Sequence, residues 1–152
     1  MTNINKKYMD LAFFYAKMAY NLNEVPIGAV IVKDDEVVSY GFNLKERNNS
    51  VLDHAEIIAI KEAARKLNNW RLDGCSMYVT LDPCPMCASA IKQSRISYVY
   101  SALENSDLEN SELIRKIFSN SATNPYVYFC SNIASERSKK LLNSFFKKRR
   151  NQ

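Results

Sequence analysis

A single histidine and one closely spaced cysteine pair constrain this chain more than any other feature of its sequence. His54 is the only histidine among 152 residues, and Glu56 follows two positions later in the segment DHAEIIAI. Cys84 and Cys87 are three residues apart in the segment LDPCPMCASA. Imidazole and thiolate groups together form the mixed nitrogen and sulfur set that suits zinc. We therefore expect a fold that brings these two segments to one place.

Length and composition indicate one globular domain, which we expect to span residues 1–152. Hydrophobic residues make up 47% of the chain, so a sizeable core can form. The sequence has no run of about 18 apolar residues, and its start lacks the apolar segment of a secretion signal, so we expect no membrane contact and a cytoplasmic location. In a reducing compartment, a close cysteine pair more often binds metal than forms a disulfide. Cys75 and Cys130 lie in apolar segments and are expected to be buried, inert thiols.

Hydrophobic periodicity predicts an α/β fold. The segments VPIGAVIVK and EVVSYGFN are joined by Asp34 and Asp35, which predicts a β-hairpin. After the hairpin, predicted helices and strands alternate, which indicates a sheet with parallel pairs, covered by helices on both faces. We expect helices at 6–22, 54–67, 84–93, 107–119 and 134–149, and strands at 25–33, 36–43, 75–81, 96–100 and 126–130.

The cysteine pair is spaced as a metal site requires. Because Cys84 and Cys87 are three residues apart at the start of a predicted helix, both sulfurs lie on the same face. A helix N-terminus lowers the pKa of a thiol and favours the thiolate that a metal binds. Pro83 suits the helix entrance, since its missing N–H is not needed there. A redox pair is the alternative for C-x-x-C, but it leaves His54 unexplained.

The position of Glu56 indicates catalysis. Three protein ligands leave a fourth zinc position open for water, whereas a structural site normally fills all four. A carboxylate beside zinc-bound water can take its proton and deliver it to a leaving group. His-x-Glu followed by Pro-Cys-x-x-Cys is the pattern of zinc-dependent nucleobase deaminases. The alternatives are that His54 only packs or caps a helix and that Glu56 is only an acid near a helix N-terminus.

The basic residues of the chain are concentrated at its C-terminal end. The net charge is +5, and the segment 139–150 holds six lysines and arginines with no acid. One interpretation is a solvated helix end that complements the helix dipole. The other is a surface that binds phosphates.

The sequence resembles the bacterial tRNA-specific adenosine deaminases, within the cytidine and deoxycytidylate deaminase superfamily. The resemblance extends over about residues 8–150 and is carried by NEVPIGAVIV, GFN, HAEIIAI, NWRLDGCSMYVTLDPCPMCASAI, SRI and LLNSFFKKRR. Members convert the wobble adenosine of tRNAs of the tRNA-Arg type to inosine. The resemblance implies a cytidine-deaminase-like three-layer α/β/α sandwich with a mixed central sheet, one Zn²⁺ per subunit, a homodimer, and binding of the tRNA anticodon loop.

The resemblance also implies roles for individual residues. His54, Cys84 and Cys87 would hold zinc, and Glu56 would carry protons while zinc-bound hydroxide attacks C6 of adenine. The expected substrate-binding residues surround a flipped base: Asn43, Val25, Pro26, Ile27, Ala55 and Leu81. The expected RNA-binding residues lie on the C-terminal helix: Phe145, Phe146, Lys147, Arg149 and Arg150.

Three features depart from the family pattern. Asp82 stands where the family commonly has glutamate, Asp53 replaces a small residue, and the stretch 101–112 contains no glycine. These features concern the choice of RNA rather than the reaction. Two other functions remain open: a guanine or cytosine deaminase acting on the free base, which needs no basic tail, and an inactive zinc-stabilised scaffold, which needs no Glu56.

Overall fold

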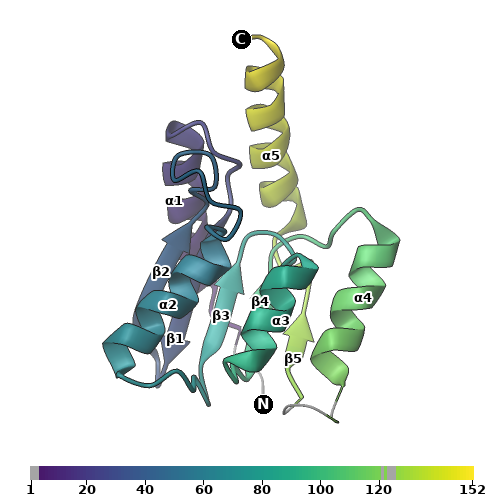
Figure 1. Cartoon of the computed structure of the whole chain (residues 1–152). Helices are drawn as coiled ribbons and strands as arrows, with labels where there is room; N and C mark the ends of the chain where they lie inside the picture. Colours follow the sequence, from purple (N-terminus) through teal and green to yellow (C-terminus); the bar gives the residue numbers. More distant parts are fainter. Residues whose placement is uncertain (1–3, 121, 123–125) are drawn as a thin grey trace.

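Five strands form one mixed sheet in a computed structural model that describes residues 4–120, 122 and 126–152 (Figure 1). Residues 1–3, 121 and 123–125 of the expected domain lie outside this part of the chain. The strands are β1 (Gly28–Lys33), β2 (Glu36–Phe42), β3 (Ser76–Val79), β4 (Tyr98–Ser101) and β5 (Tyr128–Cys130). The helices are α1 (Lys6–Asn21), α2 (Ala55–Leu67), α3 (Pro85–Gln93), α4 (Leu108–Ser119) and α5 (Ser135–Arg150). Within the described ranges, no helix is long and apolar enough to cross a membrane.

The order of the sheet, β2-β1-β3-β4-β5, combines a hairpin with parallel crossovers. β1 is antiparallel to both β2 and β3, whereas β3, β4 and β5 are parallel to one another. Asp34 and Asp35 both have positive φ, 50° and 61°, which matches the tight turn expected between the two strands. The predicted hairpin and mixed sheet are therefore confirmed. As a result, β2, β3 and β4 all end at the same edge of the sheet.

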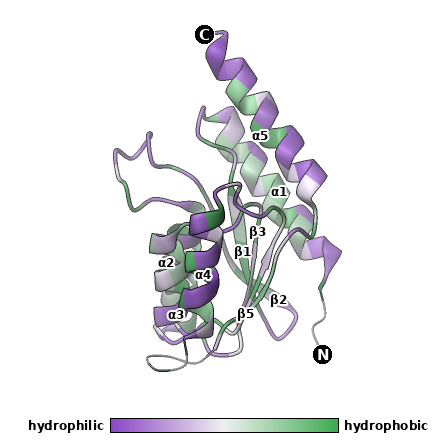
Figure 2. Ribbon diagram, turned by 90° about the vertical axis from the view of Figure 1, so that its right-hand side faces the viewer, coloured by the Kyte–Doolittle hydropathy of each residue, from purple (hydrophilic) through white to green (hydrophobic). Residues whose placement is uncertain are grey.

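Helices cover both faces of the sheet, so the three-layer α/β/α sandwich is confirmed. α2, α3 and α4 lie on one face, and α1 and α5 lie on the other (Figure 2). Successive residues of β1 point to opposite faces: Ile31 packs in the core under α2–α4, and Val30 packs against α1. β1 and β3 are buried on both faces, which explains their continuous apolar runs.

Two glycines allow helices to approach the hairpin closely. A Cβ atom at Gly28 would overlap the backbone of α1 at the Ala12 carbonyl. A Cβ atom at Gly41 would overlap the Ala55 carbonyl in the first turn of α2. The second contact fixes the start of α2, and therefore His54, against β2.

The strand predicted at 25–33 is shorter than expected. β1 begins only at Gly28, because Pro26 lacks an N–H and the preceding residues turn, with the Ile27 N–H donating to the Val25 carbonyl at 2.8 Å. This short turn lies at the edge of the sheet where β2 and β3 end.

Candidate zinc and substrate site

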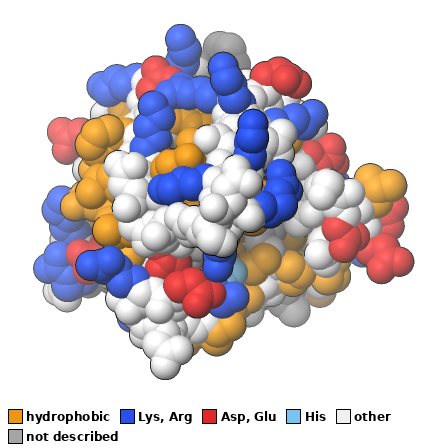
Figure 3. Space-filling view, turned by 90° about the horizontal axis from the view of Figure 1, so that it is seen from above, with side chains coloured by type: hydrophobic (Ala, Val, Ile, Leu, Met, Phe, Trp, Pro, Cys, Tyr) orange, Lys and Arg blue, Asp and Glu red, His pale blue; other side chains and the backbone are white. Residues whose placement is uncertain are grey.

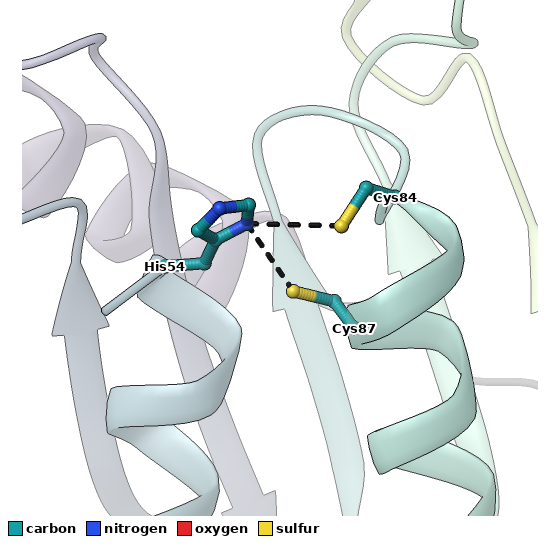
Figure 4. Close-up of side chains that lie close together, drawn as sticks. All are labelled: His54, Cys84 and Cys87. Atoms are coloured by element: carbon teal, nitrogen blue, oxygen red, sulfur yellow. Dashed lines mark hydrogen bonds between the residues drawn. The ribbon is translucent and has the colours of Figure 1, made fainter. Parts of the chain in front are cut away.

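Two helix N-termini bring the predicted ligands together at this edge of the sheet (Figure 4). His54 precedes α2 as its N-cap, and Cys84 precedes α3 in the same way. Neither side chain makes a capping hydrogen bond, so the interpretation of His54 as only a capping residue is wrong. Nδ1 of His54 lies 3.7 Å from Sγ of Cys84 and 3.5 Å from Sγ of Cys87.

The spacing of these three donors fits a zinc ion. Two donors on a tetrahedral zinc, one nitrogen at about 2.0 Å and one sulfur at about 2.3 Å, are about 3.5 Å apart. Both nitrogen–sulfur distances are close to that value, and the three donor atoms lie within 4.8 Å of one another. No other His, Cys, Asp or Glu group in the described ranges is arranged to hold a metal. Cys75 is buried away from this cluster, as expected of an inert thiol.

The two thiols of the cluster differ in their pKa values, and only Cys84 is held in the charged form. The Cys87 thiol donates a hydrogen bond to Cys84, which lowers the pKa of Cys84 to about 5. The same contact, together with burial, raises the pKa of Cys87. Backbone N–H groups of the first turn of α3, at Met86 and Cys87, further lower the pKa of Cys84. Cys84 is therefore held as the thiolate that a metal binds.

Glu56 is a buried carboxyl in the first turn of α2. Its side chain is only 4% exposed, and burial raises its pKa to about 7. Nearby Cys84 contributes to this increase in pKa, which the backbone N–H of Glu56 partly opposes. A carboxyl with a pKa near neutrality can both accept and donate a proton during turnover.

Asn43 and the turn before β1 form a connected wall beside the cluster. The backbone N–H of Asn43 donates to the Ile27 carbonyl at 3.2 Å, and its side-chain amide donates to the Val25 carbonyl at 3.5 Å. Asn43 and Pro26 are buried, while Val25 and Ile27 are half-buried. Ala55 is the first residue of α2, directly after His54. The structure therefore brings together the residues expected to surround a base.

A cleft of about 560 Å³ leads from this wall to α5. Val25 and Leu81 line it at the wall, and Leu142 and Phe146 line it on α5. Residues 103–106 line it as well, so the glycine-free stretch borders the cleft. Another cavity, of about 670 Å³, lies near Tyr8 and Asp35, away from the cluster.

The two phenylalanines of α5 differ in their surroundings. Phe145 is 1% exposed, and its ring centroid lies 5.8 Å from that of Tyr20 on α1. Phe146 is 44% exposed and lines the cleft. Buried side chains cannot touch RNA directly, so Phe145 anchors α5 to α1 rather than forming the surface. The remaining expected RNA-binding residues are exposed: Lys147, Arg149 and Arg150.

Two buried carboxylates border the site without having been identified from the sequence as site residues. The sequence marks Asp82 only as a departure from the family pattern, yet Asp82 accepts hydrogen bonds from the Ser131 hydroxyl at 2.6 Å and the Asn105 N–H at 3.2 Å. Glu24 belongs to no metal or catalytic motif, although it lies within the segment NEVPIGAVIV. A charged residue inside an otherwise apolar segment is the sequence signal that could identify Glu24 as a buried residue of the site.

An imidazole, two thiols and a buried carboxyl, gathered at helix N-termini on an α/β/α sandwich, define a zinc-dependent hydrolytic deaminase. Residues 2–103 match the family described as the cytidine and deoxycytidylate deaminase zinc-binding region. The chain belongs to this family and, within it, to the tRNA-specific adenosine deaminases, as the following relatives show.

The chain is 37% identical over 149 residues to the tRNA-specific adenosine deaminase of Buchnera aphidicola subsp. Schizaphis graminum, covering 98% of both chains. It is 40% identical over 154 residues to that of Aquifex aeolicus, covering 95% of both. A structure from a study of A-to-I editing by tRNA:A34 deaminases matches with a TM-score of 0.83 and 35% identity, covering 91% of this chain and 100% of the other. A guanine deaminase from Bacillus subtilis matches with a TM-score of 0.66 and 28% identity, covering 99% and 96%.

Proposed function

We propose that this chain hydrolyses the wobble adenosine of a tRNA to inosine, consuming water and releasing ammonia. The observation that carries the proposal is the His54, Cys84 and Cys87 cluster beside buried Glu56, in a chain that belongs to the tRNA-specific adenosine deaminases. An inactive scaffold would have no use for Glu56 in this position.

The chemistry follows from the groups around the cluster. His54, Cys84 and Cys87 would hold zinc, which would supply hydroxide near neutral pH. Glu56 accepts one proton from the attacking water and donates it to the purine ring, then accepts the proton of the new C6 hydroxyl and donates it to the amino group, which leaves as ammonia. The Ala55 N–H, in the first turn of α2, has no partner within its helix and is available to the base. Asn43 hydrogen-bonds the base.

The apolar wall completes the base pocket. Val25, Pro26, Ile27 and Leu81 pack against the faces and edge of the flipped adenine and exclude bulk water. Water exclusion strengthens the hydrogen bonds that orient the base and prevents proton loss to solvent.

The anticodon loop is the part of tRNA that suits this site. Bases in a single-stranded loop can be splayed out with little loss of pairing. Phe146 offers a ring for stacking, and Lys147, Arg149 and Arg150 offer positive charge for phosphates. A free base has no phosphates, so a guanine or cytosine deaminase would not need this basic end of α5.

We further propose a cytoplasmic homodimer with one zinc ion per subunit. The support for a dimer is that Val51 and Leu52, directly before the ligand segment, are exposed apolar side chains. Sedimentation velocity of the zinc-loaded protein tests it: a single species of about 35 kDa is expected, twice the 17.5 kDa chain mass, and a species at the chain mass would contradict it.

Inosine formation tests the reaction. The zinc-loaded protein is incubated with tRNA-Arg bearing adenosine at the wobble position, and with free guanine, cytosine and adenosine in parallel. Inosine in the tRNA alone is expected. Turnover of a free base without tRNA turnover would favour the free-base alternative.

A further inference from the structure

Glu24 is a buried carboxylate that the proposed reaction does not use. Its side chain is 1% exposed, and both oxygens accept backbone N–H groups: Glu46 at 3.0 Å and Arg47 at 2.6 Å. Burying a carboxylate is costly unless it is hydrogen-bonded, and charge-assisted bonds of this kind are strong. Glu24 therefore fixes the backbone of the segment between β2 and α2.

That segment, residues 44–50, is held by further hydrogen bonds at both ends. The side chain of Asn43 accepts the Lys45 N–H at 3.2 Å, so a proposed base-binding residue is tied to the start of the segment. The Leu44 N–H donates to the Asp53 carbonyl at 3.0 Å, and the Asn48 amide donates to the Asp53 carboxylate at 2.8 Å. Asp53 precedes the ligand His54, so segment 44–50 is fixed relative to the cluster from both sides.

The segment presents two cationic side chains without an ion pair in the described part of the chain, on either side of the exposed Glu46. Lys45 and Arg47 are exposed, and neither takes part in an ion pair with another described residue. The segment stands above the sheet on the α2 side, and α5 stands on the opposite side (Figure 2). Seen from above, lysines and arginines lie on one side of the visible part of the histidine, and apolar side chains lie on the other (Figure 3).

We propose that segment 44–50 is a second phosphate-binding surface, at which Lys45 and Arg47 bind the RNA backbone across the base pocket from α5. Glu24 is its positioning residue. This inference rests on the proposed function, because a nucleotide flipped out of a strand leaves phosphates on both sides of the pocket. Holding both flanks keeps the base inserted, whereas α5 alone would hold only one.

Salt-dependent binding tests the proposal. The probe is a fluorescently labelled tRNA-Arg anticodon stem-loop with adenosine at the wobble position, titrated with zinc-loaded protein at 50 to 200 mM KCl. Lys45→Gln/Arg47→Gln should raise Kd about tenfold and reduce the slope of log affinity against log salt by about 1.4, for two phosphate contacts to a single-stranded segment. The matched control is Lys66→Gln/Lys116→Gln, which removes the same charge at the ends of α2 and α4 remote from the cluster.

Glu24→Gln tests the positioning role. An amide leaves one of the two backbone N–H groups without an acceptor, so the tRNA KM should rise while kcat changes less than about twofold. Added to the Lys45 and Arg47 changes, it should raise KM little further, because the surface it positions is already lost.

Two results overturn the inference: a Kd and salt slope for Lys45→Gln/Arg47→Gln equal to those of the wild type, or an equal loss in the control pair. Inosine formation by the wild-type chain, measured in the same preparation, separates this outcome from failure of the proposed function. A wild-type protein that forms no inosine in tRNA would instead overturn the function.

Discussion

The carboxylate of Asp82 accepts a 2.6 Å hydrogen bond from the hydroxyl of Ser131, although 49 positions separate the two residues. Asp82 lies two residues before the ligand Cys84, and Ser131 directly follows β5. The second carboxylate oxygen accepts the Asn105 N–H, and the Asp82 N–H donates to the Leu103 carbonyl at 2.8 Å. Since Leu103 and Asn105 line the cleft, this buried residue connects the metal-binding segment to the wall of the cleft.

Asp82→Ala should therefore both lower the free energy of unfolding of the protein and raise its KM for tRNA. Removing a charged acceptor leaves the Asn105 N–H and Ser131 hydroxyl without their partner, at a cost of about 3 kcal/mol in the free energy of unfolding. Urea denaturation measures this loss, and steady-state kinetics should show a raised tRNA KM. Asp82→Asn keeps one acceptor oxygen and should lose less. An Asp82→Ala variant as stable as the wild type would show that the contacts contribute nothing.

Cys87→Ser should abolish stable zinc binding. Losing a direct thiolate ligand should weaken affinity by more than the about 10- to 100-fold that follows loss of a partner outside the ligand shell. Elemental analysis after dialysis against a weak chelator measures the zinc content. Cys130→Ser is the matched control, because Cys130 is a half-buried thiol outside the cluster, and it should keep one zinc per chain. Full zinc occupancy in Cys87→Ser would remove this residue from the ligand set.

Glu56→Gln should retain zinc and the fold but lose turnover. The amide has nearly the same shape and cannot accept the proton from water, so kcat should fall at least about 100-fold. Inosine release from tRNA measures kcat, and elemental analysis confirms that zinc is present. Turnover within tenfold of the wild type would refute the proton-carrying role.

The stability of the metal-free protein should depend on pH through the same residue. Burial raises the pKa of Glu56 from 4.5 to about 7, so the folded state binds this proton more tightly than the unfolded state. Between these pH values the folded state carries more protons, and its free energy of unfolding falls as pH rises. The Glu56→Gln protein, freed of zinc by a chelator, lacks this loss. Its free energy of unfolding, relative to that of the zinc-free wild type, should rise by at most about 3 kcal/mol from pH 4.5 to 7 and stay constant above pH 7. Urea denaturation at each pH checks this, and parallel curves for the two proteins would contradict it.

Periodicity was sufficient to predict the elements, because it depends on local spacing. The zinc motif was sufficient to predict the ligand cluster, although His54 lies 30 positions from Cys84, because one imidazole and two thiols together suit a single metal ion. The hydrogen bonds of Glu24 and Asp82 could not be predicted in this way. Glu24 reaches residues 22 and 23 positions away, and Asp82 reaches Ser131, and no local pattern records which loops a tertiary fold brings together. Their burial is visible only once the loops are placed.

The orientation of α5 is an intermediate case. Consecutive helical residues point about 100° apart, so Phe145 and Phe146 cannot face the same surroundings. Helical spacing places Leu141 with Phe145 and Leu142 with Phe146, but it does not say which pair faces α1. Packing against Tyr20 decides this, and it separates the anchoring function of α5 from its proposed contact with RNA.

Substitutions on α5 should reveal these two functions separately. Lys147→Gln/Arg149→Gln/Arg150→Gln changes only exposed side chains, so the free energy of unfolding should stay within about 0.5 kcal/mol of the wild type. Three lost phosphate contacts should reduce the salt slope of tRNA binding by about 2. Phe145→Ala should instead cost about 3 to 5 kcal/mol in stability, because it leaves a cavity between α5 and α1. Urea denaturation and anisotropy titrations on both variants distinguish the effects. If the charge variant bound tRNA with the wild-type salt slope, the basic end of α5 would be only a solvated helix terminus.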